Sequence, residues 1–224
     1  MTATEWKIDV RGDQTTAVFE AATAQQIRDT VFVCAHGAGG HMGDKGMSKL
    51  VDTLRSSGVN VVRFNFLYSE RGSGRLDPMP RLEQCFAAVV DRVRQEIDPR
   101  ILIIGGRSMG GRAASMMAAK GFVCDGLLLF AYPLHPAGQP EKLRDAHLPS
   151  IRVPVLCFNG TRDALCTPSL MEAALQTVNA QWAMTWLEGA DHSFHVLKSS
   201  GKTDAAVLGD VGDTTRQWLL RLVE

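Results

Sequence analysis

The hydrophobic positions along the chain alternate between short apolar runs and longer stretches with helical spacing. The apolar runs predict strands, which we place at residues 30–35, 60–66, 101–105, 127–131, 153–158 and 181–187. Apolar residues with helical spacing predict helices, which we place at residues 47–58, 82–97, 112–120, 168–178 and 208–222. Alternating strands and helices predict an α/β protein with a mostly parallel sheet and helices on both faces.

Other features are predicted from only a few neighbouring residues. A short strand at 16–20 could pair with residues 6–10, and Thr167-Pro168 predicts a helix start with the threonine oxygen as cap. Two stretches, 67–81 and 133–150, lack clear periodicity and are too short for a large lid. We therefore expect a single domain over residues 1–224, with no large cap domain and an open site.

The composition narrows the classes of partner and compartment. Basic and acidic residues balance at 24 each, which leaves no electrostatic footprint for nucleic acid or an anionic membrane. The first 30 residues lack the pattern of a signal peptide, and no apolar run approaches the ~20 residues of a membrane-spanning helix. Five cysteines without a C-x-x-C motif are typical of buried thiols in a reducing cytoplasm, so we expect a cytoplasmic protein. We also expect it to be a monomer or a homodimer.

One short motif carries most of the chemistry. Gly106-Arg107-Ser108-Met109-Gly110 directly follows the apolar run 101–105 and precedes a predicted helix. A serine between glycines at such a junction is typical of a nucleophile held in a tight strand-to-helix turn. Side chains at Gly106 and Gly110 would collide with the neighbouring strand and helix. The alternative is a glycine-rich turn whose serine caps a helix.

A serine nucleophile needs a base, and the base needs an acid that orients it. Asp163 follows the strand at 153–158, and His192 follows the last strand. The order serine, acid, histidine along the chain matches the one expected for this kind of turn. Weaker alternatives remain open: Asp145 and Asp125 for the acid, and His195 for the base.

The negative oxygen formed during acyl transfer needs two backbone N–H donors. Met109 follows the nucleophile at a helix N-terminus, and Ala38 lies in the glycine-rich loop 36–40 after the strand at 30–35. Gly37 and Gly39 would let the backbone approach a substrate. We expect His36 to shape this loop rather than act as a base.

Taken together, His36-Gly37, Gly106-x-Ser108-x-Gly110, Asp163 and His192 resemble the α/β-hydrolase superfamily over nearly the whole chain. The small layout resembles its dienelactone-hydrolase-like branch. Three stretches are similar to uncharacterised bacterial hydrolases and to the hydrolase-like domain of a mammalian histone-acetyltransferase complex subunit: 63–66, 69–72 and 191–194. Dienelactone hydrolase itself uses a cysteine nucleophile, so Ser108 implies a serine esterase mechanism instead.

Charged and apolar residues near the motif are candidates for substrate contacts. Guanidinium groups of Arg71, Arg107 and Arg112 could lie near the site, and Arg71 and Arg107 are candidate substrate contacts. Arg71 could steer an acidic group of the substrate; a solvated loop arginine or an internal salt bridge is the alternative. Four methionines could line an apolar pocket or simply fill the core: Met42, Met47, Met79 and Met109.

The sequence thus predicts a serine hydrolase that cleaves a small ester or thioester through an acyl-enzyme. Ser108 would attack, His192 would carry the proton, and Asp163 would orient the histidine. We expect a small-molecule substrate and neither a metal nor an organic cofactor. Two alternatives stay open, a hydrolase-shaped binding or scaffold protein and a serine peptidase.

Overall fold

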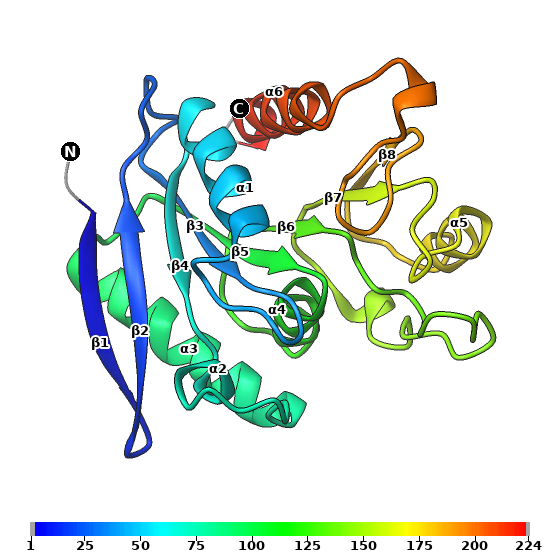
Figure 1. Ribbon diagram of the computed structural model, residues 1–224. Coiled ribbons are helices and arrows are strands. Elements are labelled where there is room, and N and C mark those ends of the chain that lie inside the picture. Colours follow the sequence, from blue (N-terminus) through cyan, green and yellow to red (C-terminus); the bar gives the residue numbers. More distant parts are fainter. Residues whose placement is uncertain (1–2, 223–224) are drawn as a thin grey trace.

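The computed structural model describes residues 3–222, which form an eight-stranded sheet with helices on both faces (Figure 1). The strands are β1 (Thr4–Val10), β2 (Asp13–Glu20), β3 (Thr30–Ala35), β4 (Asn60–Phe64), β5 (Ile101–Arg107), β6 (Gly126–Phe130), β7 (Val155–Gly160) and β8 (Trp182–Leu187). The helices are α1 (Lys45–Ser56), α2 (Leu67–Glu70), α3 (Met79–Glu96), α4 (Met109–Ala119), α5 (Pro168–Leu175) and α6 (Asp204–Leu222). Two short 3₁₀ turns span Leu148–Ser150 and Lys198–Ser200.

The strand order in the sheet is β1-β2-β4-β3-β5-β6-β7-β8. The pairs β1·β2 and β2·β4 are antiparallel, and all other neighbours are parallel. The predicted pairing of residues 6–10 with 16–20 is confirmed, with Trp6 opposite Ala17. Because β3 to β8 are parallel, their carboxyl ends meet at one edge of the sheet, where ligands of open α/β folds bind.

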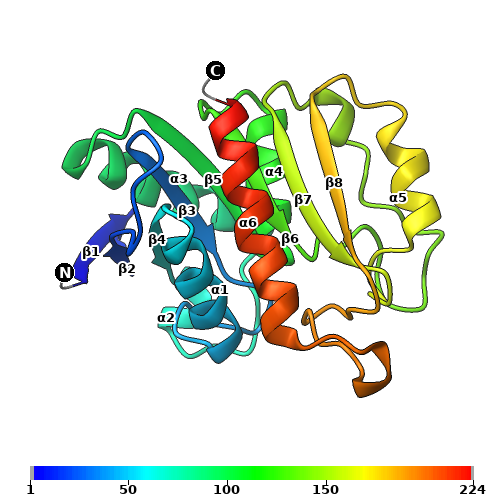
Figure 2. The same cartoon turned by 90° about the horizontal axis from the view of Figure 1, so that it is seen from above.

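Helices cover both faces of the sheet, as the strand–helix alternation predicts. Helices α1 and α6 lie on one face, and α3, α4 and α5 lie on the other (Figures 1 and 2). Each face has its own apolar core: Leu54 and Trp218 belong to the first, and Phe86 and Met171 to the second. The strands between them are buried on both sides, which explains their continuous apolar runs.

The structure departs from the predicted elements where short local signals compete with tertiary contacts. The strand predicted at 60–66 ends at Phe64, and α5 ends at Leu175 rather than near residue 178. Thr167 does not cap α5 with its side chain; its hydroxyl instead contacts His135 Nε2 at 3.0 Å. The stretch 67–81 contains α2 and the first turn of α3, whose start lies three residues before the predicted one.

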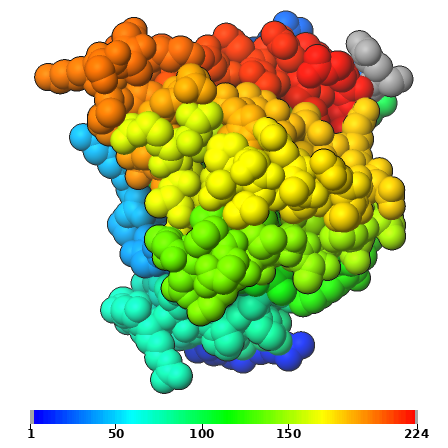
Figure 3. Space-filling view, turned by 90° about the vertical axis from the view of Figure 1, so that its right-hand side faces the viewer, coloured from blue at the N-terminus to red at the C-terminus, as the bar shows by residue number. Residues whose placement is uncertain are grey.

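The two stretches without periodicity form local walls rather than a separate cap domain. Residues 133–150 contain only a single 3₁₀ turn, and they lie beside residues 66–80 on the face shown in Figure 3. In the part of the chain that the structure describes, no helix is long and apolar enough to cross a membrane.

Candidate active site

Ser108 lies in a strained turn between β5 and α4. Its backbone has φ +51° and ψ −117°, a region that non-glycine residues avoid. The turn is fixed from both sides: the Ser108 N–H donates to the Phe130 carbonyl at 2.8 Å, and the Ser108 carbonyl accepts the Arg112 N–H at 3.0 Å. Strain of this kind persists only when surrounding structure holds it, and it presents the hydroxyl at the edge of the sheet.

The glycines on either side of this turn allow a close approach to β3. A Cβ at Gly106, whose φ is +139°, would lie 2.2 Å from the Ala35 carbonyl oxygen, and one at Gly110 would lie 2.6 Å from the His36 carbonyl oxygen. The predicted collisions are therefore present. Both, however, involve the end of β3 and its loop rather than a strand on one side and a helix on the other.

The structure brings Ser108, His192 and Asp163 together, although they are far apart along the chain. His192 Nε2 lies 3.0 Å from Ser108 Oγ, and His192 Nδ1 lies 2.8 Å from Asp163 Oδ2. A carboxylate can only accept, so Nδ1 of the neutral ring donates to Asp163 and Nε2 accepts the serine O–H. This arrangement can remove a proton from the Ser108 hydroxyl.

Asp163 is held by groups that the sequence analysis did not single out. Its carboxylate is buried and accepts the Leu165 N–H at 2.8 Å and the Asn159 side-chain amide at 3.3 Å. Asn159 is itself buried and binds both backbone groups of Tyr132, at 3.0 and 3.1 Å. The signal for Asn159 was a polar residue at the end of a buried apolar strand, four positions before the acid.

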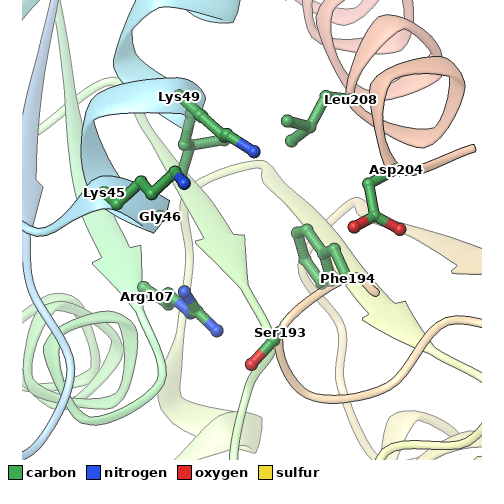
Figure 4. Close-up of a pocket in the computed structure, with 9 residues that line it drawn as sticks. Lys45, Gly46, Lys49, Arg107, Ser193, Phe194, Asp204 and Leu208 are labelled. Atoms are coloured by element: carbon green, nitrogen blue, oxygen red, sulfur yellow. The ribbon is translucent and has the colours of Figure 1, made fainter. Parts of the chain in front are cut away.

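Arg107 holds the histidine loop from the other side. Its guanidinium donates to the His192 carbonyl oxygen at 2.9 Å. Burial lowers the pKa of Arg107, while Asp191 and Asp163 nearby favour its charged form. Figure 4 shows Arg107 and Ser193 beside a cavity of about 300 Å³ whose rim carries Lys45 and Lys49.

Two other cavities, unlike the one in Figure 4, are lined by Ser108. The histidine-side cavity, about 310 Å³, is lined by both Ser108 and His192, together with Gly37, Ala38 and Arg107. The arginine cavity, about 490 Å³, is lined by Ala38, Ser108, Met109, Arg112 and Arg144 and by apolar residues. A reacting group at Ser108 would therefore have space on two sides.

The backbone N–H groups of Ala38 and Met109 are free to act as donors. Neither one donates to an acceptor within residues 3–222, and both residues line the arginine cavity beside Ser108. A Cβ at Gly37 would lie 3.5 Å from Ser108 Cβ, so this loop packs directly on the serine. Two such donors beside a nucleophile can stabilise a negative oxygen.

The loop that carries Ala38 is shaped by His36, as expected. His36 is buried; its Nδ1 donates to the Gly37 carbonyl at 2.8 Å, and its Nε2 accepts the Phe66 N–H at 3.1 Å. Burial lowers the pKa of His36, which fits a neutral structural ring. Gly39 has φ +71° and lines neither of the two cavities that contain Ser108.

Comparison with known proteins identifies the family. A family model described as an alpha/beta hydrolase domain matches residues 28–220. The chain belongs to the alpha/beta hydrolase family.

Solved structures share the fold of this hydrolase at low sequence identity. An alpha-beta serine hydrolase homologue from Coxiella burnetii is 20% identical, with a TM-score of 0.76 over 100% of this chain and 99% of that one. A serine hydrolase without lid from Xanthomonas campestris is 22% identical, with a TM-score of 0.74 over 96% and 94%. Dienelactone hydrolase from Anabaena variabilis is 16% identical, with a TM-score of 0.75 over 98% and 97%. At these identities the similarity establishes the fold alone. This chain and the dienelactone hydrolase therefore share one fold.

The alternative acids and bases of the hydrolase lie away from Ser108 or have other partners. Asp125 accepts the Leu102 N–H at 2.7 Å, at the amino-terminal end of β5. The exposed His195 pairs with Asp204 at 3.0 Å. Asp145 lies before the Leu148–Ser150 turn, where its backbone carbonyl accepts the Leu148 N–H at 2.8 Å.

A second serine–histidine contact joins Ser115 Oγ and His147 Nε2 at 2.8 Å. Ser115 is fully buried in α4, and its hydroxyl also donates to the Arg112 carbonyl at 2.8 Å. Because no substrate can reach a fully buried hydroxyl, this pair fixes the chain around Arg112 rather than forming a second nucleophilic site.

The remaining candidates divide between the site and the fold. Arg71 pairs with Asp77 at 2.6 Å, the internal salt bridge that was the alternative to a substrate contact. Met79 and Met109 line the arginine cavity, and Met47 of α1 lines the histidine-side cavity while also packing in the core. Within the described residues, no group of three or more His, Cys, Asp or Glu side chains is arranged to hold a metal ion.

Proposed function

We propose that this protein is a serine hydrolase that cleaves a small carboxylic ester or thioester through an acyl-enzyme. The observation that carries the proposal is the hydrogen-bonded series Ser108–His192–Asp163, with separations of 3.0 and 2.8 Å. Membership of the alpha/beta hydrolase family supports it.

In the proposed reaction, Ser108 Oγ attacks the carbonyl carbon while His192 Nε2 takes the hydroxyl proton. The carbonyl oxygen becomes negative and accepts the N–H groups of Ala38 and Met109, assisted by the dipole at the start of α4. His192 then gives its proton to the leaving oxygen or sulfur, and Asp163 stabilises the charged ring between the two transfers. A water molecule repeats the sequence and releases the acid.

The leaving group would occupy the histidine-side cavity, because the group that receives the proton must lie within reach of His192. The acyl part would extend from Ser108 into the arginine cavity. Both volumes suit a small substrate.

The proposal is tested with the Ser108→Ala variant. We expect it to lose p-nitrophenyl butyrate hydrolysis by about 10⁴-fold or more in kcat and to lose labelling by a fluorophosphonate probe. Ser115→Ala is the matched control, since it removes the other serine that contacts a histidine and should keep both activities. Unchanged turnover in folded Ser108→Ala, or no labelling of the folded wild-type protein, would contradict the proposal and favour a scaffold.

A further inference from the structure

Two arginines line the cavity that contains the nucleophile. Arg112 and Arg144 reach the arginine cavity from α4 and from the stretch 133–150. Both side chains are partly buried there. Two cationic groups at one cavity repel each other unless an anion lies between them.

The guanidinium of Arg112 has no protein partner within residues 3–222. Its Nε is buried without a hydrogen bond, and its terminal nitrogens form neither a hydrogen bond nor an ion pair there. An unpaired buried donor is costly and is usually satisfied by something. The missing acceptor is therefore expected to come from outside the described chain.

Arg144 is nearly as free. Its guanidinium has one long contact, 3.5 Å to the Pro133 carbonyl oxygen, and no carboxylate partner in the described part of the chain. Burial, and then repulsion from Arg112, lower the pKa of Arg144. A bound anion would oppose both effects, because its negative charge stabilises the charged form of the guanidinium.

Among residues 3–222, Asp77 is the one acid that lines this cavity, and its carboxylate is taken by Arg71 at 2.6 Å and by the Tyr68 N–H at 2.8 Å. Asp145 follows Arg144 in the chain and raises the pKa of His147, but it does not line the cavity. Among neighbouring titratable groups, His147 stays neutral at ordinary pH because burial and Arg112 lower its pKa to about 4.

The backbones of both arginines are anchored, which fixes the points from which the two side chains enter the cavity. The Tyr132 hydroxyl donates to the Arg144 carbonyl at 3.0 Å, and the Ser115 hydroxyl donates to the Arg112 carbonyl at 2.8 Å. Arg112 also lies one helical turn beyond Ser108, with which it shares a backbone hydrogen bond of 3.0 Å. Both residues also line the arginine cavity, so a molecule bound there lies beside the nucleophile and Arg112 alike.

Apart from Ser108, Asp77 and the two arginines, the side chains that line the arginine cavity are apolar: Ala38, Leu76, Met79, Leu82, Met109, Pro133, Pro136, Ala137 and Leu165. Such a lining suits methylene groups, while the two guanidinium groups suit a carboxylate that accepts their hydrogen bonds.

We propose that the arginine cavity binds an acyl chain that ends in a carboxylate, held by Arg112 and Arg144. The substrate would be a half-ester or half-thioester of a short dicarboxylic acid, and water would convert it to the free diacid and an alcohol or thiol. This inference rests on the proposed function, because it assigns the acyl side of the same reaction.

The test compares two esters of nearly equal shape, monomethyl glutarate and the uncharged methyl 5-methylhexanoate, by proton release. We expect the wild-type protein to prefer the charged ester by about 10- to 100-fold in kcat/KM, the range expected for a charge-assisted hydrogen bond. Arg112→Met and Arg144→Met should each remove most of that preference. Arg100→Met is the matched control: it removes the same charge from an exposed position before β5, at the opposite edge of the sheet, and should keep the preference.

A wild-type protein with equal kcat/KM for the two esters, or a preference that survives both arginine variants, would overturn the inference. If Arg112→Met does not fold, Arg112→Lys replaces it, because lysine keeps the charge and the aliphatic stem but lacks the two-pronged guanidinium. This variant should show a reduced preference for the charged ester. A preference equal to that of the wild type would count against the inference.

Glutarate binding to Ser108→Ala, measured by calorimetry, separates this inference from the proposed function. Binding that is lost when Arg112→Met is added supports the carboxylate site even if no ester is cleaved. Conversely, cleavage of the uncharged ester that depends on Ser108, without glutarate binding, would uphold the proposed function and refute the carboxylate site.

Discussion

At the scale of single residues, the site depends on buried polar groups whose partners come from distant parts of the chain. Asn159 links Asp163 to the backbone of Tyr132, and Arg107 links β5 to the His192 carbonyl. We interpret these two as positioning residues, since their side chains bind the histidine loop and the acid and form no hydrogen bond to Ser108 within residues 3–222. The order of motifs along the chain predicted Ser108, Asp163 and His192, but it contained nothing that paired Asn159 or Arg107 with its partner.

His147 should make the stability of the protein fall in mild acid. Burial and Arg112 lower its pKa from 6.5 to about 4, so between these values the unfolded chain binds a proton that the folded one does not. The stabilisation by neutral His147 is therefore complete above about pH 6.5 and is lost as the pH falls towards 4. We expect His147→Gln to lose less unfolding free energy than the wild type between about pH 7 and about pH 5, as measured by urea denaturation.

His41→Gln is the control for this measurement, because it removes an exposed histidine, 3.0 Å from Asp44, and leaves His147 in place. It should keep the loss of stability that His147 causes between about pH 7 and about pH 5. Parallel curves for His147→Gln and the wild type would show that His147 does not carry the effect.

At the scale of the elements, α1 and α6 pack against each other on one face of the sheet (Figure 2). A Cβ at Gly212 of α6 would lie 2.6 Å from Ser57 Oγ and 3.0 Å from Thr53 Cγ2, both at the end of α1. Periodicity predicted these helices, because the apolar stripe of a helix is written in its own sequence. It did not predict α2 or the 3₁₀ turn at 148–150, since such short pieces are stabilised by their surroundings.

Two glycines of α6 should therefore respond differently to alanine. Gly209 is exposed, with no atom within 4 Å of an added Cβ, so Gly209→Ala should raise the unfolding free energy by about 0.5–1 kcal/mol through helix propensity. Gly212→Ala should gain less or lose stability, because the methyl group displaces the Ser57 hydroxyl from its 3.0 Å bond to the Thr53 carbonyl. Equal stabilisation by the two variants in urea denaturation would contradict this packing.

At the scale of the whole molecule, the sheet gathers loops that follow four different strands. The loops after β3, β5, β7 and β8 supply Ala38, Ser108, Asp163 and His192 to one edge. The sheet, which is covered by helices on both faces, also encloses most of the thiols. All five cysteines are free, and four of them are buried. The interpretation of these cysteines as small hydrophobic residues agrees with their places in the core.

The thiols should accordingly be unreactive in the folded protein. Burial raises the pKa of Cys34, Cys85 and Cys166 to about 12 and that of the half-buried Cys124 to about 11. At about pH 8 we expect dithionitrobenzoate to react with essentially no thiol of the native protein within minutes, and with all five in concentrated guanidinium chloride. Cys124→Ser should leave the native protein unreactive; rapid reaction of a native thiol would show that the core opens readily.

The sequence by itself determined the alternation of elements, the strained turn at Ser108 and the order of the nucleophile, acid and histidine. These features depend on the spacing of residues that are near neighbours in the chain and on the order of the loops along it. Local steric constraints and the burial of apolar side chains act on that spacing directly. Only the tertiary structure showed that Ser115 also contacts a histidine and that Ser115, unlike Ser108, is too deeply buried to meet a substrate. It also decided that Arg71 has a carboxylate partner while Arg112 has none among the residues that the structure describes, because the partner of a side chain depends on which distant segment the sheet places beside it.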